Sequence, residues 1–152
     1  RHIRLEWANG LVPGAFFASE IFRNFSQLLD EWASTDPGVL DYFGKASLMT
    51  QSHGQGHMAY FEHRFGLKGF YLLDEPENAL SPKTQLRLLS ILESGMRSGV
   101  AQFVIATHSP ILLSLPGARI LSFDASPIDE VSYKDTEQYR VYRDFIRNSE
   151  SG

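Results

Sequence analysis

The stretch that most constrains the fold is Gly69–Pro76, which reads Gly-Phe-Tyr-Leu-Leu-Asp-Glu-Pro. Its apolar run predicts a strand that is buried on both faces, as in a parallel sheet covered by helices. Pro76 cannot continue the hydrogen-bonded ladder, so the strand should end there. Asp74 and Glu75 then lie at the carboxyl end of a buried strand, where open α/β sheets bind their ligands. The segment therefore predicts both the fold class and a candidate site.

Composition narrows the class of protein. The 152 residues are enough for one domain with a core, and 43% hydrophobic with 21% charged residues is typical of a globular protein. The formal net charge of −4 gives no general attraction to nucleic acid. The absence of cysteine excludes disulfides and thiolate metal sites. No membrane segment or signal peptide is visible, so we expect a cytoplasmic protein.

Local patterns predict alternating strands and helices. Residues 2–7 and 15–17 have the pattern of strands, and Ser19 is a good N-cap for an amphipathic helix over residues 20–33. The residues expected on the inner face of this helix are Ile21, Phe25, Leu28, Leu29 and Trp32.

From residue 69 onward the same alternation predicts a parallel sheet. Ser81-Pro82 should start a helix that Gly99 ends, and residues 102–107 should form the next buried strand. Further strands are expected at 119–123 and 130–133. Asp135 or Thr136 should cap a last helix with an inward apolar face of Tyr139, Tyr142, Phe145 and Ile146.

Two other polar segments accompany Asp74-Glu75. Residues 51–57 read Gln-Ser-His-Gly-Gln-Gly-His and run into a helical apolar pattern, which predicts a helix N-terminus able to bind an anion. Thr107-His108-Ser109 follows the next buried strand. All three segments lie at turns between elements, so their chemistry can meet at one edge of the sheet.

In this order the three segments resemble the nucleotide-binding domain of ABC ATPases. Tyr-Leu-Leu-Asp-Glu-Pro-Glu, Ala-Leu-Ser-Pro and Ala-Thr-His-Ser-Pro-Ile-Leu-Leu are similar to the bacterial stand-alone predicted ATPases, an ABC-like family often filed under the AAA label. The resemblance covers most of the chain from about Gly14 to Phe145. It implies a P-loop NTPase-like α/β fold, with a mostly parallel sheet and flanking helices.

The resemblance also assigns each motif of the family to a range of residues. Residues 1–152 would be the carboxyl-terminal part of one ABC-type ATPase domain. The signature motif would occupy about 51–65, the Walker B strand and D-loop 69–82, and the strand with the switch histidine 102–110.

The resemblance implies roles for individual residues. Asp74 would hold Mg²⁺, and Glu75 would act as general base on the attacking water. These two side chains would point to opposite sides, as consecutive residues on an extended strand do. His108 would contact the γ-phosphate of ATP.

The remaining implied roles concern a dimer. A head-to-tail homodimer would hold two nucleotides at its seam, with one subunit's signature motif contacting the other's nucleotide. The residues that would bind this nucleotide in trans are Ser52, Gly54 and Gln55. Asn78 and Ser81 would belong to the D-loop, and Glu20 would take a Q-loop-like place, although the usual glutamine is absent.

The chain departs from the family pattern at the phosphate-binding loop. Gly-x-x-x-x-Gly-Lys-[Ser/Thr] is absent, and the Gly44-Lys45 pair is followed by Ala46. We therefore expect that the complete ATPase has an amino-terminal segment with this loop, and that these 152 residues alone do not hydrolyse ATP. The alternative is a non-catalytic interaction or assembly module derived from an ATPase.

Two other patterns have competing interpretations. His53 and His57 are one helical turn apart and could form a metal pair, but the signature motif explains them better because no third ligand is apparent. Arg140, Arg143 and Arg147 form a basic stripe, for which a solvated helix face is the better interpretation. Nucleic-acid binding is possible in principle, but the sequence does not support it.

Overall fold

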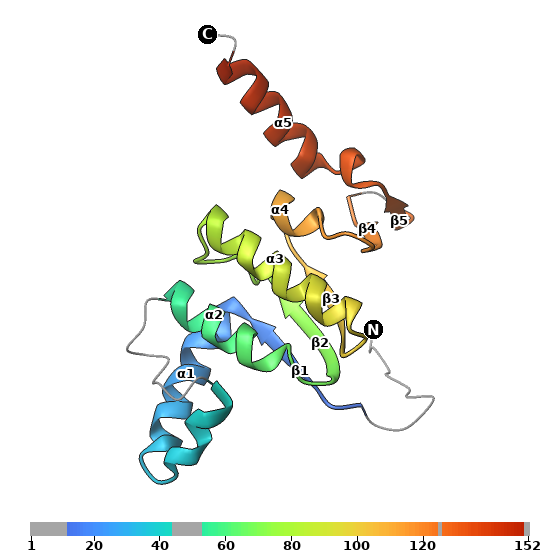
Figure 1. Cartoon of the computed structure of the whole chain (residues 1–152). Coiled ribbons are helices and arrows are strands. Elements are labelled where there is room, and N and C mark those ends of the chain that lie inside the picture. The colour runs from blue at the N-terminus through green and yellow to red at the C-terminus, as the bar shows by residue number, and fades with distance from the viewer. Residues whose placement is uncertain (1–11, 44–52, 125, 151–152) are drawn as a thin grey trace.

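The computed structural model describes residues 12–43, 53–124 and 126–150. Figure 1 shows a mixed α/β arrangement in which the last helix extends away from the rest. The predicted strand at residues 2–7 lies outside the described residues. In chain order the elements are β1 Gly14–Ala18, α1 Ser19–Ala33, the 3₁₀ helix η1 Pro37–Phe43, α2 His53–Arg64, β2 Gly69–Asp74, α3 Pro82–Arg97, β3 Ala101–Ala106, α4 Pro110–Leu113, β4 Ile120–Ser122, β5 Asp129–Val131, the 3₁₀ helix η2 Tyr133–Asp135 and α5 Glu137–Glu150.

In the part of the chain that the structure describes, the main sheet has three parallel strands in the order β1-β2-β3. Its register places Leu72 of β2 beside Phe16 of β1 and Val104 of β3. Helices α2 and α3 lie over one face of the sheet (Figure 1). The structure therefore confirms the predicted α/β class, a parallel sheet with flanking helices, consistent with a partial P-loop NTPase-like domain.

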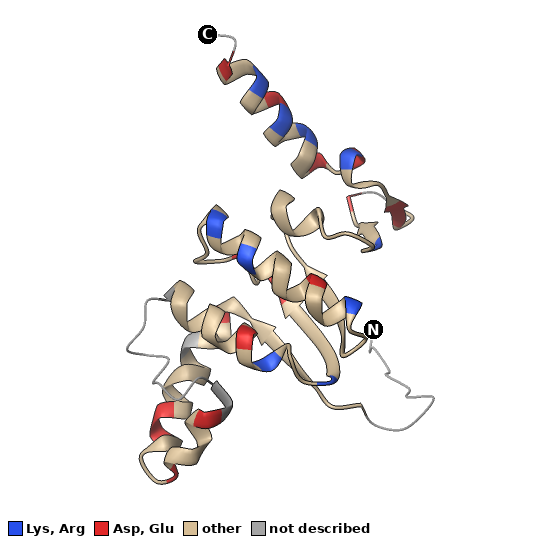
Figure 2. Ribbon diagram, viewed as in Figure 1, with Lys and Arg blue, Asp and Glu red and all other residues tan. Residues whose placement is uncertain are grey.

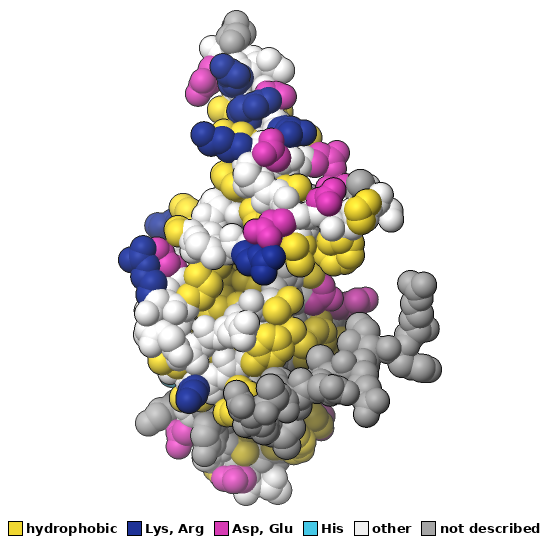
Figure 3. Space-filling view, turned by 90° about the vertical axis from the view of Figure 1, so that its right-hand side faces the viewer, with side chains coloured by type: hydrophobic (Ala, Val, Ile, Leu, Met, Phe, Trp, Pro, Cys, Tyr) yellow, Lys and Arg dark blue, Asp and Glu magenta, His cyan; other side chains and the backbone are white. Residues whose placement is uncertain are grey.

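The opposite face of the sheet is more open than the sequence predicts. Phe16 and Val104 are 58% and 53% exposed, and Leu72 between them is half-buried. The prediction that the β2 strand is buried on both faces is wrong for the described part of the chain, because the helices α2 and α3 share one face. Figure 3 shows hydrophobic side chains gathered over the middle of the molecule, below the charged helix α5.

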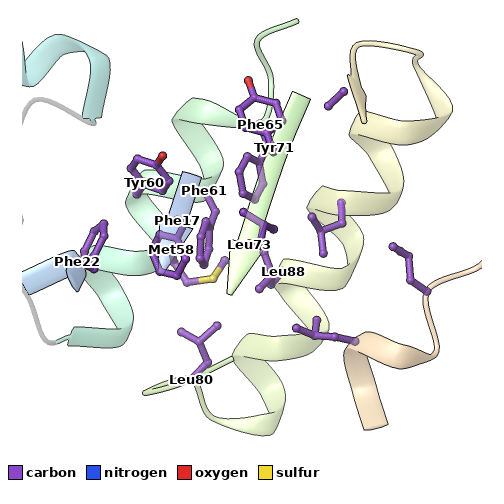
Figure 4. Close-up of a cluster of buried hydrophobic side chains, with 14 of the residues drawn as sticks. Phe17, Phe22, Met58, Tyr60, Phe61, Phe65, Tyr71, Leu73, Leu80 and Leu88 are labelled. Atoms are coloured by element: carbon purple, nitrogen blue, oxygen red, sulfur yellow. The ribbon is translucent and has the colours of Figure 1, made fainter. Parts of the chain in front are cut away.

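The core fills the space between the sheet and α2. Figure 4 shows rings from β1, α1, α2 and β2 packed together, with Met58 and Leu73 beside them. The Phe61 ring lies 4.7 Å from the Phe17 ring and 5.2 Å from the Phe65 ring, between centroids. Phe61, Phe65 and Met58 are all buried, as the helical spacing in this segment predicts. This aromatic core fixes α2, and with it the amino end of that helix, against the sheet.

Helix α1 turns only part of its predicted face to the core; Leu29 is buried and Phe25 packs against the core, as expected. Phe22, Ser26 and Leu29 are buried, whereas Ile21, Leu28 and Trp32 are 42–52% exposed. Because α1 begins directly after β1, the strand fixes the rotation of the helix and points Phe22 at Phe17 and Tyr60. Ser19 is also not the N-cap; Ala18 takes that position, with no side-chain cap hydrogen bond.

The last two strands do not extend the parallel sheet. β4 and β5 pair antiparallel in a separate two-stranded sheet, so the prediction of a parallel sheet throughout is wrong here. Only residues 123–128 connect them. A parallel connection needs a crossover of about a dozen or more residues, so this short link allows only a hairpin.

Helix α5 does not turn the predicted apolar face inward. Thr136 caps it by accepting a hydrogen bond from the Tyr139 N–H at 3.3 Å, as expected. However, Tyr142, Phe145 and Ile146 are at least half exposed, because the helix projects away from the sheet (Figure 1). In Figure 2 the ribbon of the same helix is coloured for Lys and Arg at several places along its length, which agrees with a solvated face.

The buried Tyr71 gives a testable stability prediction. Its hydroxyl lies 2.8 Å from the carbonyl oxygens of both Arg64 and Leu67, where α2 ends. Tyr71→Phe leaves these carbonyls without that donor, so the free energy of unfolding should fall by about 1–2 kcal/mol. Urea unfolding at neutral pH measures this, with Tyr142→Phe on exposed α5 as the matched control. An equal, small effect in both variants would contradict the prediction.

The same hydroxyl gives an alkaline pH dependence. Burial raises the pKa of Tyr71 above the ordinary tyrosine value, so folding favours the protonated phenol. The stabilisation is complete below about pH 10, where the unfolded phenol is also protonated, and is lost as pH rises through the folded pKa. Thermal unfolding scans from pH 9 upward should show a smaller alkaline loss in Tyr71→Phe than in the wild type.

Candidate active site

The carboxyl ends of the parallel strands bring Asp74, Glu75 and His108 to one edge of the sheet. Asp74 is the last residue of β2 and is aligned with Ala18 of β1 and Ala106 of β3. The segments that follow these strands begin with Ser19 and Thr107. The expectation that the chemistry gathers where parallel strands end is therefore met by the backbone arrangement.

Glu75 has an unusual backbone conformation. Its φ is +45°, in the left-handed region that a residue with a side chain seldom adopts, at a cost on the order of 1 kcal/mol. Its N–H still donates to the Ala106 carbonyl at 2.9 Å. The expectation that Asp74 and Glu75 diverge because both are extended is wrong, since the chain turns at Glu75. A turned backbone sets the direction of the carboxylate instead.

The Glu75 carboxylate lies between two side chains. The Asn78 amide Nδ2 donates to Oε2 at 2.7 Å, and His108 Nε2 lies 3.9 Å from Oε1. The Glu75 side chain remains 45% exposed and His108 79% exposed, so solvent reaches both groups. The structure thus brings together two residues from separate strand ends that the sequence assigned to one site.

Asn78 connects three parts of the site. Its Nδ2 also donates to the Ser19 hydroxyl at 3.1 Å, at the start of α1. Its carbonyl accepts a hydrogen bond from His57 Nδ1 at 3.2 Å. His57 is 3% exposed and its ring meets Phe22 edge-on at 4.6 Å, so it is a core residue that holds α2 to this segment.

The described part of the signature segment packs against the residues after β2. Helix α2 begins at His53, so Gly54 and Gln55 lie in its first turn, while Ser52 is outside the described residues. A Cβ on Gly54 would lie 2.6 Å from the Ala79 carbonyl oxygen, which explains why glycine is needed there. The signature segment and the D-loop segment, both expected at the dimer interface, therefore lie side by side.

Two further residues of the predicted site lie at the amino-terminal ends of helices. Ser81 caps α3, because its hydroxyl accepts from the Thr84 N–H at 3.3 Å, and Pro82 follows as the first helical residue. Glu20 is an exposed residue in the first turn of α1. The contacts of the described residues do not connect Glu20 to Glu75 or His108.

The site also contains two residues that the sequence pattern did not indicate, Glu77 and Gln85. Glu77 Oε1 accepts from the backbone N–H groups of both His108 and Ser109, at 2.8 and 3.1 Å. The Ser109 hydroxyl donates to Gln85 Oε1 at 2.6 Å. A third acid directly after Asp-Glu-Pro is the signal that could have indicated Glu77. No local signal marks Gln85, because its role depends on where α3 lies.

Mg²⁺ is the metal ion that the predicted activity implies. Asp74 is exposed at the strand end, and its carboxylate makes no hydrogen bond or ion pair with another described residue. Within the described ranges no three His, Cys, Asp or Glu side chains cluster closely enough to hold a metal by themselves. One free carboxylate fits Mg²⁺, which keeps several waters and is bound by one or two carboxylates plus substrate phosphates.

Comparison with known proteins supports an ATPase-type domain. Residues 52–114 match the family described as "AAA domain, putative AbiEii toxin, Type IV TA system". The match spans less than half of the chain and contains Asp74, Glu75, Glu77 and His108. It supports an AAA- or ABC-like P-loop ATPase-type domain with a nucleotide-binding function, and it does not favour the non-catalytic alternative. Searches of curated proteins and of solved structures gave no match.

None of the described helices combines the length and apolar character needed to cross a bilayer.

Proposed function

We propose that this chain forms the carboxyl-terminal part of an ATPase domain that binds ATP with Mg²⁺ and hydrolyses it. The observation that carries the proposal is the Glu75 carboxylate, held at the end of β2 between the Asn78 amide and the His108 ring. A carboxylate fixed at a strand end and open to solvent can accept a proton from a bound water. The match of residues 52–114 to an AAA domain supports this class of chemistry.

The proposed reaction is attack of water on the γ-phosphorus of ATP. The water oxygen forms a bond to phosphorus, the bond to the β,γ-bridging oxygen breaks, and Glu75 accepts the proton of the water. Asn78 fixes the carboxylate through its 2.7 Å hydrogen bond, and His108 lies on the other side to contact the γ-phosphate. Asp74 would hold Mg²⁺, which neutralises developing charge on the phosphates.

We propose that the phosphate-binding loop comes from another stretch of the complete gene product, because these residues contain no Gly-x-x-x-x-Gly-Lys-[Ser/Thr]. The open face of the sheet around Phe16 and Val104 supports this part of the proposal. Parallel sheets are stable when both faces are covered, so further elements of the domain should pack there. We also propose the head-to-tail homodimer, supported by the packing of Gly54 on Ala79 that brings the signature and D-loop segments together.

Asp74→Asn tests the metal site in the complete gene product. The variant should bind ATP about tenfold or more weakly in Mg²⁺, since a charged interaction worth about 1.5–3 kcal/mol is lost. With EDTA in place of Mg²⁺, wild type and variant should bind alike. Titration of a fluorescent ATP analogue measures both conditions. Asp129→Asn on exposed β5 is the matched control. Equal Mg²⁺ dependence in wild type and Asp74→Asn would contradict the assignment.

A further inference from the structure

The loop that carries His108 is tied to the segment after β2 by a single carboxylate oxygen. Glu77 Oε1 accepts hydrogen bonds from two consecutive backbone N–H groups, those of His108 at 2.8 Å and Ser109 at 3.1 Å. Hydrogen bonds to an ionised carboxylate are roughly twice as strong as those between neutral groups. The other oxygen, Oε2, is buried and has no hydrogen-bond partner among the described residues. A buried polar atom without a hydrogen bond costs free energy, so the two N–H contacts on Oε1 are the interactions that hold this carboxylate in place.

His108 depends on this connection for its position. Its side chain is 79% exposed, so few packing contacts hold the ring, and the backbone fixes the Cα from which the ring extends. The next residue, buried Ser109, is held as well, because its hydroxyl donates to Gln85 Oε1 at 2.6 Å. Gln85 in turn donates to the Leu80 carbonyl at 3.1 Å. The loop after β3 is therefore tied twice to the residues that follow Glu75.

We propose that Glu77 is the positioning residue of this site, which holds the His108 ring beside Glu75 and acts on turnover only through His108. This inference rests on the proposed ATPase function for its effect on rate. Glu77 touches backbone N–H groups and no reacting atom, so it is not a catalytic residue. A purely structural role would instead lower stability and reduce every activity of the site without regard to His108.

Steady-state kinetics of the complete gene product separates these two roles. Glu77→Ala should lower kcat by roughly tenfold to a hundredfold, the scale expected when a reacting group is displaced by about 1 Å. The KM for ATP should change little. Glu77→Gln retains a carbonyl oxygen that can accept both N–H groups, so it should recover most of the rate. Glu93→Ala, which removes a carboxylate paired with Arg97 on α3, is the matched control.

A double-mutant cycle decides whether the effect passes through His108. If Glu77 acts only by placing the ring, Glu77→Ala should add no further loss of kcat to His108→Ala. A loss of kcat in the double variant equal to the product of the two single losses would overturn the proposal. An unchanged kcat in folded Glu77→Ala would also overturn it. Urea unfolding confirms that the compared variants are folded under the assay conditions.

A second measurement does not depend on ATP turnover. The ¹H–¹³C NMR signals of the His108 ring and the ¹H–¹⁵N signals of His108 and Ser109 should move in Glu77→Ala and stay in place in Glu93→Ala. An inactive wild type would contradict the proposed function, and these signals would then judge the positioning role alone. His108 signals that do not change in Glu77→Ala would overturn the inference even if the wild type hydrolyses ATP.

Discussion

Glu75→Gln should lower ATP turnover by about 10²–10⁴-fold in the complete gene product, the range usual for loss of a general base. The amide cannot accept the proton of the attacking water, while its size lets the surrounding contacts form again. The Asn78 Nδ2 that now donates to Glu75 Oε2 at 2.7 Å can donate to the new carbonyl oxygen. ATP binding should therefore survive, and the unhydrolysed nucleotide should hold the proposed homodimer together.

Phosphate release measures turnover in this experiment, and light scattering coupled to size exclusion measures the dimer with and without ATP. Glu93→Gln makes the same chemical change on α3, where Glu93 pairs with Arg97, and its rate should match the wild type. Turnover within about twofold of the wild type in Glu75→Gln would refute the role of Glu75 as base. A dimer that forms equally without ATP would refute the proposal that bound nucleotide stabilises the dimer interface.

Phe61→Ala should have the largest effect on stability. Phe61 is 0% exposed and its ring is surrounded by those of Phe17, Phe65 and Tyr60. Truncation of a fully buried phenylalanine costs about 3–5 kcal/mol, because transfer energy is lost and a cavity remains. The total free energy of unfolding of a globular domain is about 5–15 kcal/mol, so the variant should be close to unfolding at 37 °C. The midpoint and slope of urea unfolding, followed by circular dichroism, measure this loss.

The chain provides a matched control for this truncation. Phe145 on α5 is 69% exposed, so Phe145→Ala removes the same atoms with almost no loss of buried surface. Its free energy of unfolding should lie within about 0.5 kcal/mol of the wild type. Similar losses in both variants would show that α5 is covered in solution and that Phe61 is not the centre of the core.

Local sequence features were enough to predict much of the fold. The apolar run before Asp74 located the central strand, and Ser81-Pro82 located the start of α3. Gly99, with φ of +67°, follows that helix as predicted. These features depend on residues within one turn or one strand, where periodicity, caps and backbone preferences act. The class of the sheet and the residues at its carboxyl edge followed from them.

Tertiary structure decided how the site residues meet. Asn78 reaches Ser19 and Glu77 reaches His108 across long separations in the chain, so these hydrogen bonds exist only once the strands are side by side. The left-handed turn at Glu75 and the buried face of α1 depend in the same way on neighbouring elements. The sequence by itself determined which strand ends carry the carboxylates and the histidine. Packing of the three strands determined their spacing, because that spacing depends on contacts between segments far apart in the chain.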